Sequence, residues 1–409
     1  MTRAISPPPL RRKGPRHETN TSGATVKAGT LRIFAWNVNG IAPLATPYLR
    51  RDQEQKSIRS FLTASGKRRR GDTGPDYEEE GKREAVSEDE RLRTFLKRHG
   101  WPHVLFLQEV KIRRGDTKIM DAVRVAVNDT SGHLGRGIAE EMAGDGGPLY
   151  DVHFNLPYDP YNAKGFGGRL YGVAAVIRRD FARSHVDTIR DVPWDKEGRV
   201  QVIETKPLTF PLIALINIYA VNGTPNPYRS IADGTTVIGT RHDRKLAVHY
   251  ELLREARHLE ERGFAVVIAG DLNVAPDARD GYPRLRTWPP QHARNRADFH
   301  SKFFGCGKVD NIEPGVKMAL LSGDTGGEEE EEEMAGFDGI DSFRAVHGDA
   351  RRYSYYPRTR DWGTSCDRVD LILLSRPLGN VLVDAGICDN PRDRGPSDHC
   401  PVWVELGGG

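Results

Sequence analysis

The sequence predicts an α/β fold in which two packed β-sheets are flanked by helices. Eight short blocks are apolar and rich in β-branched residues, which is typical of buried strands: 31–36, 103–108, 171–177, 199–204, 212–220, 264–270, 368–374 and 402–406. Apolar residues recur at helical spacing at Leu246, Tyr250, Leu253, Ala256 and Leu259, and Gly263 closes that run. Many strands with few long helices favour packed sheets.

Composition limits the classes of protein to which the chain can belong. Its 409 residues suffice for a sizeable core, and 37% hydrophobic with 29% charged residues is ordinary for a globular protein. No apolar run approaches the ~20 residues of a membrane span, so we expect no membrane association. The four cysteines form no C-x-x-C pair, which argues against structural zinc or a disulfide framework and favours a reducing compartment: Cys306, Cys366, Cys388 and Cys400.

Four segments differ from the rest in composition. Residues 1–30 begin with a basic stretch without acids, which predicts a flexible arm and a nuclear location, with a mitochondrial transit peptide or a plain disordered tail as the alternatives. Residues 51–97 and 320–336 have low complexity, so we expect insertions in a single catalytic domain over 31–406. Residues 279–298 are rich in Arg and Pro, which predicts a long surface loop in reach of a polyanion.

Polar clusters stand at the ends of six predicted strands. "WNVNG", "QEVK", "IYAVNG" and "GDLNVAP" follow strands, whereas "CDRVD" opens one and "SDHCP" precedes the last. Each cluster alone is typical of a turn, but together they predict a site built from several loops at one edge of the sheets. Asn, Asp, Glu and His without paired Cys suit hard-metal and phosphate chemistry.

Eight motifs resemble, in the same order, those of one family: "WNVNG", "LQEVK", "DKEGRV", "IYAVN", "GDLNVAP", "DSFR", "RVDLILLS" and "SDHCP". These resemble the exonuclease III-like apurinic/apyrimidinic endonucleases of the endonuclease/exonuclease/phosphatase superfamily. The resemblance implies a four-layered, deoxyribonuclease I-like α/β sandwich. It also implies Mg²⁺-dependent hydrolysis, with Mn²⁺ as a substitute, of the phosphodiester 5′ to an abasic site, with 3′-phosphodiesterase or 3′–5′ exonuclease side activity. The expected partner is double-stranded DNA with abasic or 3′-blocked lesions, and the expected state is a monomer.

The resemblance assigns the metal and the attacking water to five residues. Glu109 is expected to be the principal metal carboxylate, with Asp398 and Asn39 close to the ion. Because an amide oxygen is a weaker Mg²⁺ ligand than a carboxylate, Asn39 is expected to act through water. Asp271 is expected to position or deprotonate the attacking water, and Asn273 to orient Asp271 or to donate to a phosphate oxygen.

The remaining assignments concern the phosphate. Neutral donors are expected to hold it: Asn37, Tyr219 and Asn222. Lys111 is expected near the metal carboxylate, and His399 at the phosphate with Asp370 as its partner. A divalent ion, an imidazolium and neutral donors can share the charge that develops on a phosphodiester under in-line attack.

Two features keep alternatives open. Asp367 stands where these endonucleases often carry an apolar residue, and "CDRV" also resembles the Asp-Arg motif of the inositol-phosphate phosphatases, in which Asp367 would support His399. We favour Asp370 because "RVDLILLS" matches through the whole strand. A phosphoesterase acting on inositol phosphates, nucleotides or RNA is the alternative function, and a catalytically silent binding protein is the other. Tyr353, Tyr355 and Tyr356 fit either a stacking surface for DNA or core packing.

Overall fold

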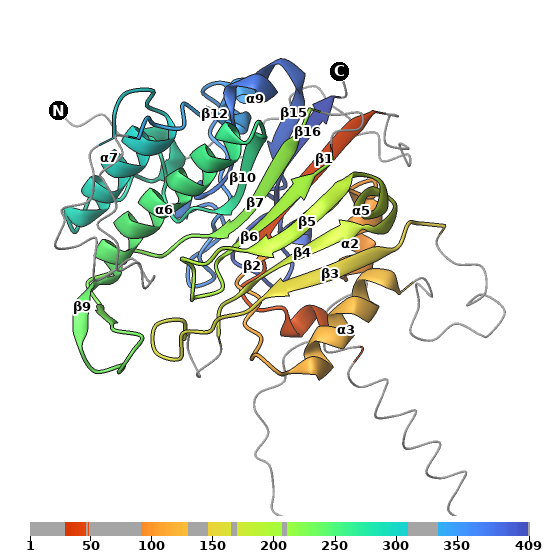
Figure 1. Ribbon diagram of the computed structural model, residues 1–409, viewed down its shortest axis with the longest axis horizontal. Helices are drawn as coiled ribbons and strands as arrows, with labels where there is room; N and C mark the ends of the chain where they lie inside the picture. The colour runs from red at the N-terminus through yellow and green to blue at the C-terminus, as the bar shows by residue number, and fades with distance from the viewer. Residues whose placement is uncertain are drawn as a thin grey trace, which may run out of the picture.

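The chain folds around two six-stranded mixed sheets (Figure 1). The computed structural model describes residues 29–45, 48, 91–129, 146–164, 170–206, 211–309 and 334–407. The first sheet has the order β15 (Leu382–Ile387), β16 (Val402–Gly407), β1 (Thr30–Asn37), β2 (Val104–Gln108), β4 (Val173–Arg178) and β3 (Tyr150–Asn155). The second has the order β12 (Ile340–Asp341), β14 (Asp370–Leu374), β10 (Ala265–Asp271), β7 (Ile213–Tyr219), β6 (Val200–Thr205) and β5 (Val186–Asp191).

All eight predicted strands are present, and the longer strands that the sequence did not predict lie at sheet edges. β3, β5 and β15 are each the last strand on one side of their sheet. An edge strand is covered less completely, and the burial of β5 shows it, since only Val186 of its six residues is fully buried. Such strands carry charged residues and lack the continuous apolar pattern of central strands. Two small two-stranded sheets complete the described strands: β8 (Pro227–Arg229) pairs with β9 (Val237–Thr240), and β11 (Gly281–Tyr282) pairs with the distant β13 (Cys366–Asp367).

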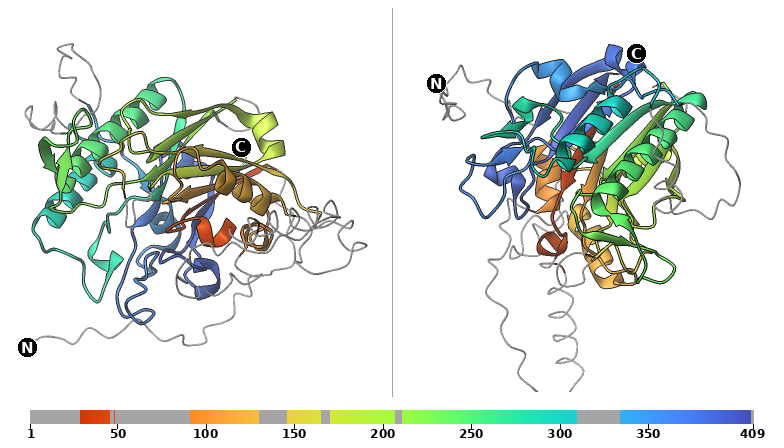
Figure 2. Two further views of the ribbon diagram at one scale, coloured as in Figure 1. Left: turned by 90° about the horizontal axis from the view of Figure 1, so that it is seen from below. Right: turned by 90° about the vertical axis from the view of Figure 1, so that its left-hand side faces the viewer.

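The sheets pack face to face, and helices cover their outer faces (Figure 2). Along β1, Ile33 and Ala35 face the second sheet, whereas Phe34 and Trp36 face the helices, as the period of two in a strand requires. α2 (Leu92–Arg98) and α3 (Thr117–Asn128) pack on the first sheet. α6 (Arg241–Glu261) and α7 (Gln291–Phe303) cover the second. The four-layered α/β sandwich is therefore confirmed.

The helix predicted from the apolar repeat is α6. The side chain of its N-cap, Thr240, accepts a hydrogen bond from the backbone N–H of Asp243, and the Asp243 carboxylate accepts one from the Thr240 N–H. Gly263 follows the last turn. Short helices also form at α5 (Arg179–His185), α9 (Ser342–His347), α10 (Pro391–Arg394), η3 (Ala278–Asp280) and η4 (Arg376–Val381). None of the helices in the described ranges is both long and apolar enough to span a bilayer.

Two predicted loop segments are partly helical. The surface loop predicted over 279–298 is wrong at its end, because α7 begins at Gln291 and buries Phe299 and Phe303 on the second sheet. Pro289 and Pro290 directly precede this helix, a place where proline is well tolerated. The insertion expected over 51–97 is likewise wrong at its end, because it includes all of α2 except Arg98. Residues 1–28, 51–90 and 310–333, which contain most of the expected arm and insertions, lie outside the described residues.

A buried charge cluster accounts for the "DKEGRV" motif. Glu197 is fully buried, and its carboxylate accepts hydrogen bonds from Arg199 (2.9 Å), Arg241 (3.1 Å) and Arg244 (3.3 Å). Burial alone would raise the pKa of Glu197, but the three guanidinium groups outweigh it and hold that pKa well below its usual range. The Arg199 guanidinium also lies 4.7 Å from the ring centre of Tyr219. The Glu197 cluster thus holds Arg199 against Tyr219, which is one of the residues expected in the site.

Substitution of Glu197 by Gln should destabilise the fold strongly. Three guanidinium groups would lose their shared anion in the interior, a loss worth about 3–5 kcal/mol for a broken buried pair. Urea unfolding measures the effect. Asp121→Asn is the matched control, because its pair with Arg124 is exposed (68% and 48%) and such pairs contribute about 0–1 kcal/mol. Equal unfolding free energies for the two variants would contradict the structural role of the cluster.

Candidate active site

The ends of six strands meet at one edge of the sandwich. β1 runs parallel to β2 and antiparallel to β16, and β10 runs parallel to β7 and antiparallel to β14. The carboxyl ends of β1, β2, β7 and β10 therefore lie beside the amino ends of β14 and β16. In register, Asp271 stands directly opposite Tyr219 on one side and Asp370 on the other. The predicted convergence of strand-end motifs is confirmed.

Buried side chains connect the two sheets beneath this edge. Asn37 Nδ2 of β1 donates to Asp271 Oδ2 of β10 over 2.9 Å, and Gln108 Nε2 of β2 donates to Asn217 Oδ1 of β7 over 2.8 Å. Gly270 brings β10 close to its neighbour, because a Cβ there would lie 2.0 Å from the Ile218 carbonyl oxygen, and its φ of 145° is one that other residues rarely adopt. Glycine at position 270 thus allows the close approach of β10 to β7 that sets the position of Asp271.

Asp271 is buried in the centre of the site and surrounded by donors. The backbone N–H of Asn273 donates to Oδ1 (2.8 Å), and its side-chain amide reaches Oδ2 (3.3 Å). His399 Nε2 lies 4.0 Å from Oδ2. Burial and the neighbouring charge of Asp370 raise the pKa of Asp271 above its usual range, while His399 and the amide donors oppose them. A carboxyl group tuned upward in this way can exchange a proton near neutral pH.

His399 pairs with Asp370. Its Nδ1 lies 2.8 Å from Asp370 Oδ2, and its backbone N–H donates to Ser397 Oγ over 3.0 Å. Burial disfavours the imidazolium, but the charges of Asp370 and Asp271 outweigh it and raise the pKa of His399. The imidazole is therefore held as a cation. Of the two proposed partners, the structure selects Asp370, since Asp367 points instead toward Arg286, 3.9 Å away.

Oxygen donors gather on the opposite side of the site. Tyr219 Oη donates to Glu109 Oε1 over 2.8 Å, and Asn39 Nδ2 donates to Asp398 Oδ1 over 2.9 Å. Lys111 joins them, because its ammonium donates to Asn39 Oδ1 and lies 3.6 Å from Glu109 Oε1. An ammonium group thus occupies a place between a carboxylate and an amide oxygen, the donor types that Mg²⁺ takes. The expected metal residues fit a hard cation.

His399, Asp271 and Asp370 also offer three ligand atoms within 4.8 Å of one another. A protonated imidazole cannot ligate a metal, so this triad is better suited to proton transfer and to contact with an anion.

Burial and Glu109 raise the pKa of Tyr219 well above its usual range, so its hydroxyl stays a donor.

Strained backbone is concentrated at the site. Of the six described non-glycine residues with positive φ, four are site residues: Asn39 (48°), Glu109 (57°), Lys111 (55°) and Asn273 (52°). Such conformations cost about 1–3 kcal/mol each and persist where the surroundings enforce them. Here hydrogen bonds enforce them directly after rigid strands.

One pocket contains nine of the eleven predicted site residues: Asn37, Asn39, Glu109, Tyr219, Asn222, Asp271, Asn273, Asp398 and His399. Asp370 and Lys111 stand directly behind that lining through the contacts given above. Ten further residues line the pocket, and five of the polar ones have no role assigned from the sequence: Lys245, Arg286, His292, Asn295 and Arg296. The Arg-rich composition of 279–298 was a signal for two of them, whereas nothing in the pattern of α6 distinguished Lys245.

The tyrosine-rich segment divides between the two interpretations. Tyr353 and Tyr356 are buried in the core between the sheets, and Tyr356 stacks on Trp362 with ring centres 3.8 Å apart. Tyr355 alone faces the pocket, with its ring centre 4.9 Å from that of His399. Core packing therefore explains two of the three.

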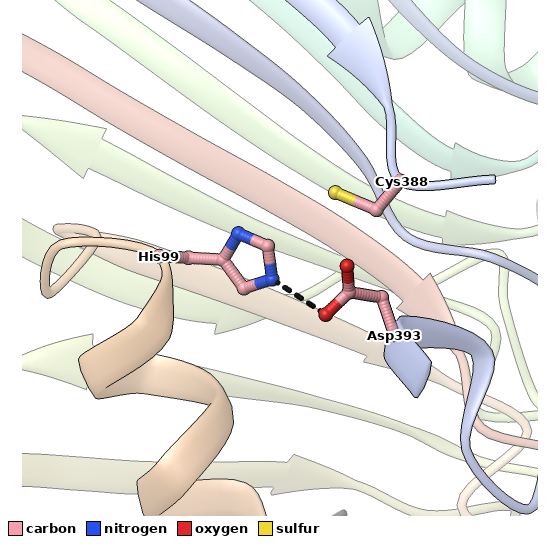
Figure 3. Close-up of side chains that lie close together, drawn as sticks. All are labelled: His99, Cys388 and Asp393. Carbon is pink, nitrogen blue, oxygen red and sulfur yellow. Dashed lines mark hydrogen bonds and ion pairs between the residues drawn. The ribbon is translucent and has the colours of Figure 1, made fainter. Parts of the chain in front are cut away.

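A second cluster of ligand-type side chains, His99, Cys388 and Asp393, lies away from the site (Figure 3). Asp393 Oδ1 lies 3.0 Å from His99 Nε2 and 2.7 Å from an Arg98 guanidinium nitrogen, and Asn390 donates to Oδ2 over 2.7 Å. Burial and Asp393 raise the pKa of Cys388 well above its usual range, which keeps the thiol protonated. Because the Asp393 carboxylate is already paired with the Arg98 guanidinium, the cluster is an ion pair that links α2 to α10.

A family model for the endonuclease/exonuclease/phosphatase family matches residues 34–399. The chain belongs to this family. Among solved structures, an AP endonuclease from Leishmania major is 16% identical with a TM-score of 0.52, covering 93% of this chain and 89% of that one. The catalytic domain of Xenopus laevis APE2 is 16% identical with a TM-score of 0.47, covering 92% of each chain. A comparison with curated protein sequences gives no match.

Family membership agrees with the resemblance drawn from the ordered motifs, and the Leishmania structure shares the fold. The Neisseria 3′ phosphatase NExo, bound to a product DNA hairpin, is 18% identical with a TM-score of 0.45, covering 92% of this chain and 99% of that one.

Replacing Asp370 by Asn should lower the pKa of His399 toward its ordinary value. The amide keeps a hydrogen-bond acceptor but removes the charge that outweighs burial. Titration of the His399 ring signals by NMR in metal-free protein measures the shift. The ring signals of His258, exposed on α6, serve as the internal control. An unchanged His399 pKa would show that Asp370 does not hold the imidazolium.

Proposed function

We propose that this chain is a Mg²⁺-dependent DNA repair nuclease that hydrolyses the phosphodiester 5′ to abasic sites, with 3′-phosphodiesterase or 3′–5′ exonuclease activity. The observation that carries the proposal is the constellation around Asp271. A buried carboxylate of raised pKa lies next to a cationic His399, opposite a set of oxygen donors suited to a hard cation. Double-stranded DNA with abasic or 3′-blocked lesions is the proposed substrate, a monomer the proposed state, and the nucleus or the mitochondrion the proposed location.

Asp271 is the proposed general base. Asn37 and Asn273 hold its carboxylate from two sides, so its orientation is fixed before substrate binds. It accepts a proton from the attacking water at Oδ1 or Oδ2 while the water oxygen bonds to phosphorus and the P–O3′ bond breaks, and O3′ takes up a proton from solvent to become the new 3′ hydroxyl. His399, Tyr219 and Asn222 face the pocket as donors for the phosphate oxygens, and Asp370 holds the His399 imidazolium in place.

Glu109 and Asp398 are the proposed metal carboxylates, with Asn39 acting through water. A Mg²⁺ ion bound there supplies Lewis-acid stabilisation of charge on the phosphate. Lys111 now lies against the same oxygens, so its ammonium would be displaced toward solvent or toward the phosphate.

Two motifs favour the nuclease branch over the phosphatases. "DKEGRV" builds the Glu197 cluster that supports Tyr219, and "DSFR" contributes Asp341 and Arg344 to a network with Arg368 and Asp280. One observation favours the alternative, a phosphoesterase acting on inositol phosphates, nucleotides or RNA. Asp367 lines the pocket where an apolar residue would suit a base-less sugar.

The decisive test is incision of a labelled duplex with one tetrahydrofuran abasic analogue. We expect a single cut 5′ to the lesion with Mg²⁺, none with EDTA, and none in an undamaged duplex. Asp271→Asn should lower turnover by about 10²–10⁴-fold, the usual contribution of a general base, with DNA affinity retained. Asp187→Asn, on the exposed face of β5, is the matched control. Phosphate release from a soluble inositol polyphosphate without lesion cleavage would instead support the alternative.

Glu109→Gln should raise the Mg²⁺ concentration needed for half-maximal incision by roughly tenfold or more, since a neutral amide is a poorer ligand for a hard cation. Electron paramagnetic resonance of Mn²⁺ binding measures the same loss without catalysis. Glu261→Gln, at the exposed end of α6, is the control. A normal metal requirement in Glu109→Gln would remove Glu109 from the metal site.

A further inference from the structure

One wall of the pocket carries a buried lysine that the proposed mechanism does not use. Lys245 projects from α6 and is 3% exposed. Its Nζ donates to the Asn273 carbonyl oxygen over 2.6 Å, which is its one acceptor among the described residues. An ammonium group has three N–H donors, so two remain for a ligand in the pocket.

Further basic residues stand on the same wall. Arg286 and Arg296 line the pocket, and Arg296 is fixed by the carbonyl oxygens of Ala275 (2.7 Å) and Arg286 (2.9 Å). His292, at the start of α7, completes the group. This set of Lys245, Arg286, His292 and Arg296 is called the basic wall below.

Positive charge outweighs negative charge at the basic wall in the free protein, where Asp367 and Asp271 are the nearest acids. Burial, together with the charges of Arg296 and Arg286, lowers the pKa of Lys245 to about 7 against the opposing charge of Asp271. Burial, with Arg286 and other basic neighbours, lowers the pKa of His292 to about 4. Cations crowded together in this way disfavour one another until an anion joins them.

We propose that the basic wall binds the phosphate next to the scissile phosphodiester on the same strand. The proposal rests on the function proposed above and narrows its substrate class to chains with successive phosphates. Lys245 contacts Asn273, and Asn273 contacts Asp271. An anion bound to Lys245 would therefore be separated from the general base by Asn273 alone. Two fixed phosphates would align the bond between them for attack.

Asp367 should affect phosphate binding in the direction opposite to Lys245. Its carboxylate lies 3.9 Å from an Arg286 guanidinium nitrogen, and Arg286 and Arg296 both act on its charge. In the free protein it is the counter-ion nearest to Arg286, so it competes with an incoming phosphate. Neutralising Asp367 should therefore strengthen phosphate binding, whereas neutralising Lys245 should weaken it.

The structural alternative is that Lys245 only ties α6 to the loop of Asn273. In that case its loss would disturb Asp271 and weaken every ligand of the pocket alike. A pair of nucleotides separates the two roles: thymidine 5′-monophosphate has one phosphate, and thymidine 3′,5′-bisphosphate has two. Isothermal titration of the full chain in Ca²⁺ measures both affinities without DNA cleavage.

We expect the bisphosphate to bind wild-type protein more tightly than the monophosphate. In Lys245→Met this advantage should fall by roughly tenfold, the usual value of one charge-assisted hydrogen bond, with monophosphate affinity retained. Arg286→Gln, whose side chain is 57% exposed and so tolerates change, should reduce the advantage in the same direction. Asp367→Asn should increase it about threefold. Lys97→Met, exposed on α2, is the matched control.

No bisphosphate advantage in wild type, or equal losses for both nucleotides in Lys245→Met, would overturn the basic wall as a phosphate subsite. A Lys245-dependent gain shown by an inositol bisphosphate but not by the nucleotide would overturn its assignment to a nucleic-acid strand. The nucleotide titrations are independent of lesion cleavage. A Lys245-dependent advantage without incision of abasic DNA would keep the subsite and reject the proposed lesion, and incision without the advantage would do the reverse.

Discussion

The hydrogen bond from Asn37 to Asp271 makes the site depend on how the two sheets pack. Its donor belongs to one sheet and its acceptor to the other, and both are buried. A buried amide or carboxylate without a partner is costly, so each sheet holds the other at a spacing that satisfies both groups. The bond between Gln108 and Asn217 repeats this constraint on the neighbouring strands β2 and β7. The core and the site are therefore parts of one packing arrangement, and Asp271 is oriented before any ligand binds.

Acidic and basic groups alternate across the pocket on either side of the bond between Asn37 and Asp271. Asp271 and Asp370 hold a cationic His399 between them, Glu109 and Asn39 hold Lys111, and the basic wall stands beyond Asn273. Opposite charges at short range in a buried site stabilise each other more than they would in water. Positive φ values at Asn39, Glu109, Lys111 and Asn273 show how this order is reached. The side chains leave rigid strands through short, strained loops, which limits their freedom to relax away from one another.

The fold and most of the site could be predicted because they depend on patterns that local sequence carries. Central strands such as β10 are buried on both faces and are continuously apolar, and the motifs after them stand where strand ends must meet. Edge strands such as β5 are half exposed and lack that signal. Lys245 lies on a helix, where a buried lysine has the same sequence appearance as an exposed one. The Arg-rich composition of 279–298 indicated Arg286. Its place beside Asp367, however, depends on the pairing of β11 with β13, which joins segments far apart in the chain.

The polarity of the pocket bears on how a substrate would be selected. An apolar pocket can recognise a base-less sugar by shape and by exclusion of water, but a pocket with Asp367, Arg286 and Lys245 in its lining has to satisfy charged groups first. Arg286 and Lys245 are best satisfied by phosphates, whose spacing along a strand is set by the polymer, whereas Asp367 opposes them. Discrimination would then come from the path of the backbone, which differs between a regular duplex and one that bends at a lesion. On this view the strained loops and the basic wall serve the same end, since both fix charged groups to which a strand must conform.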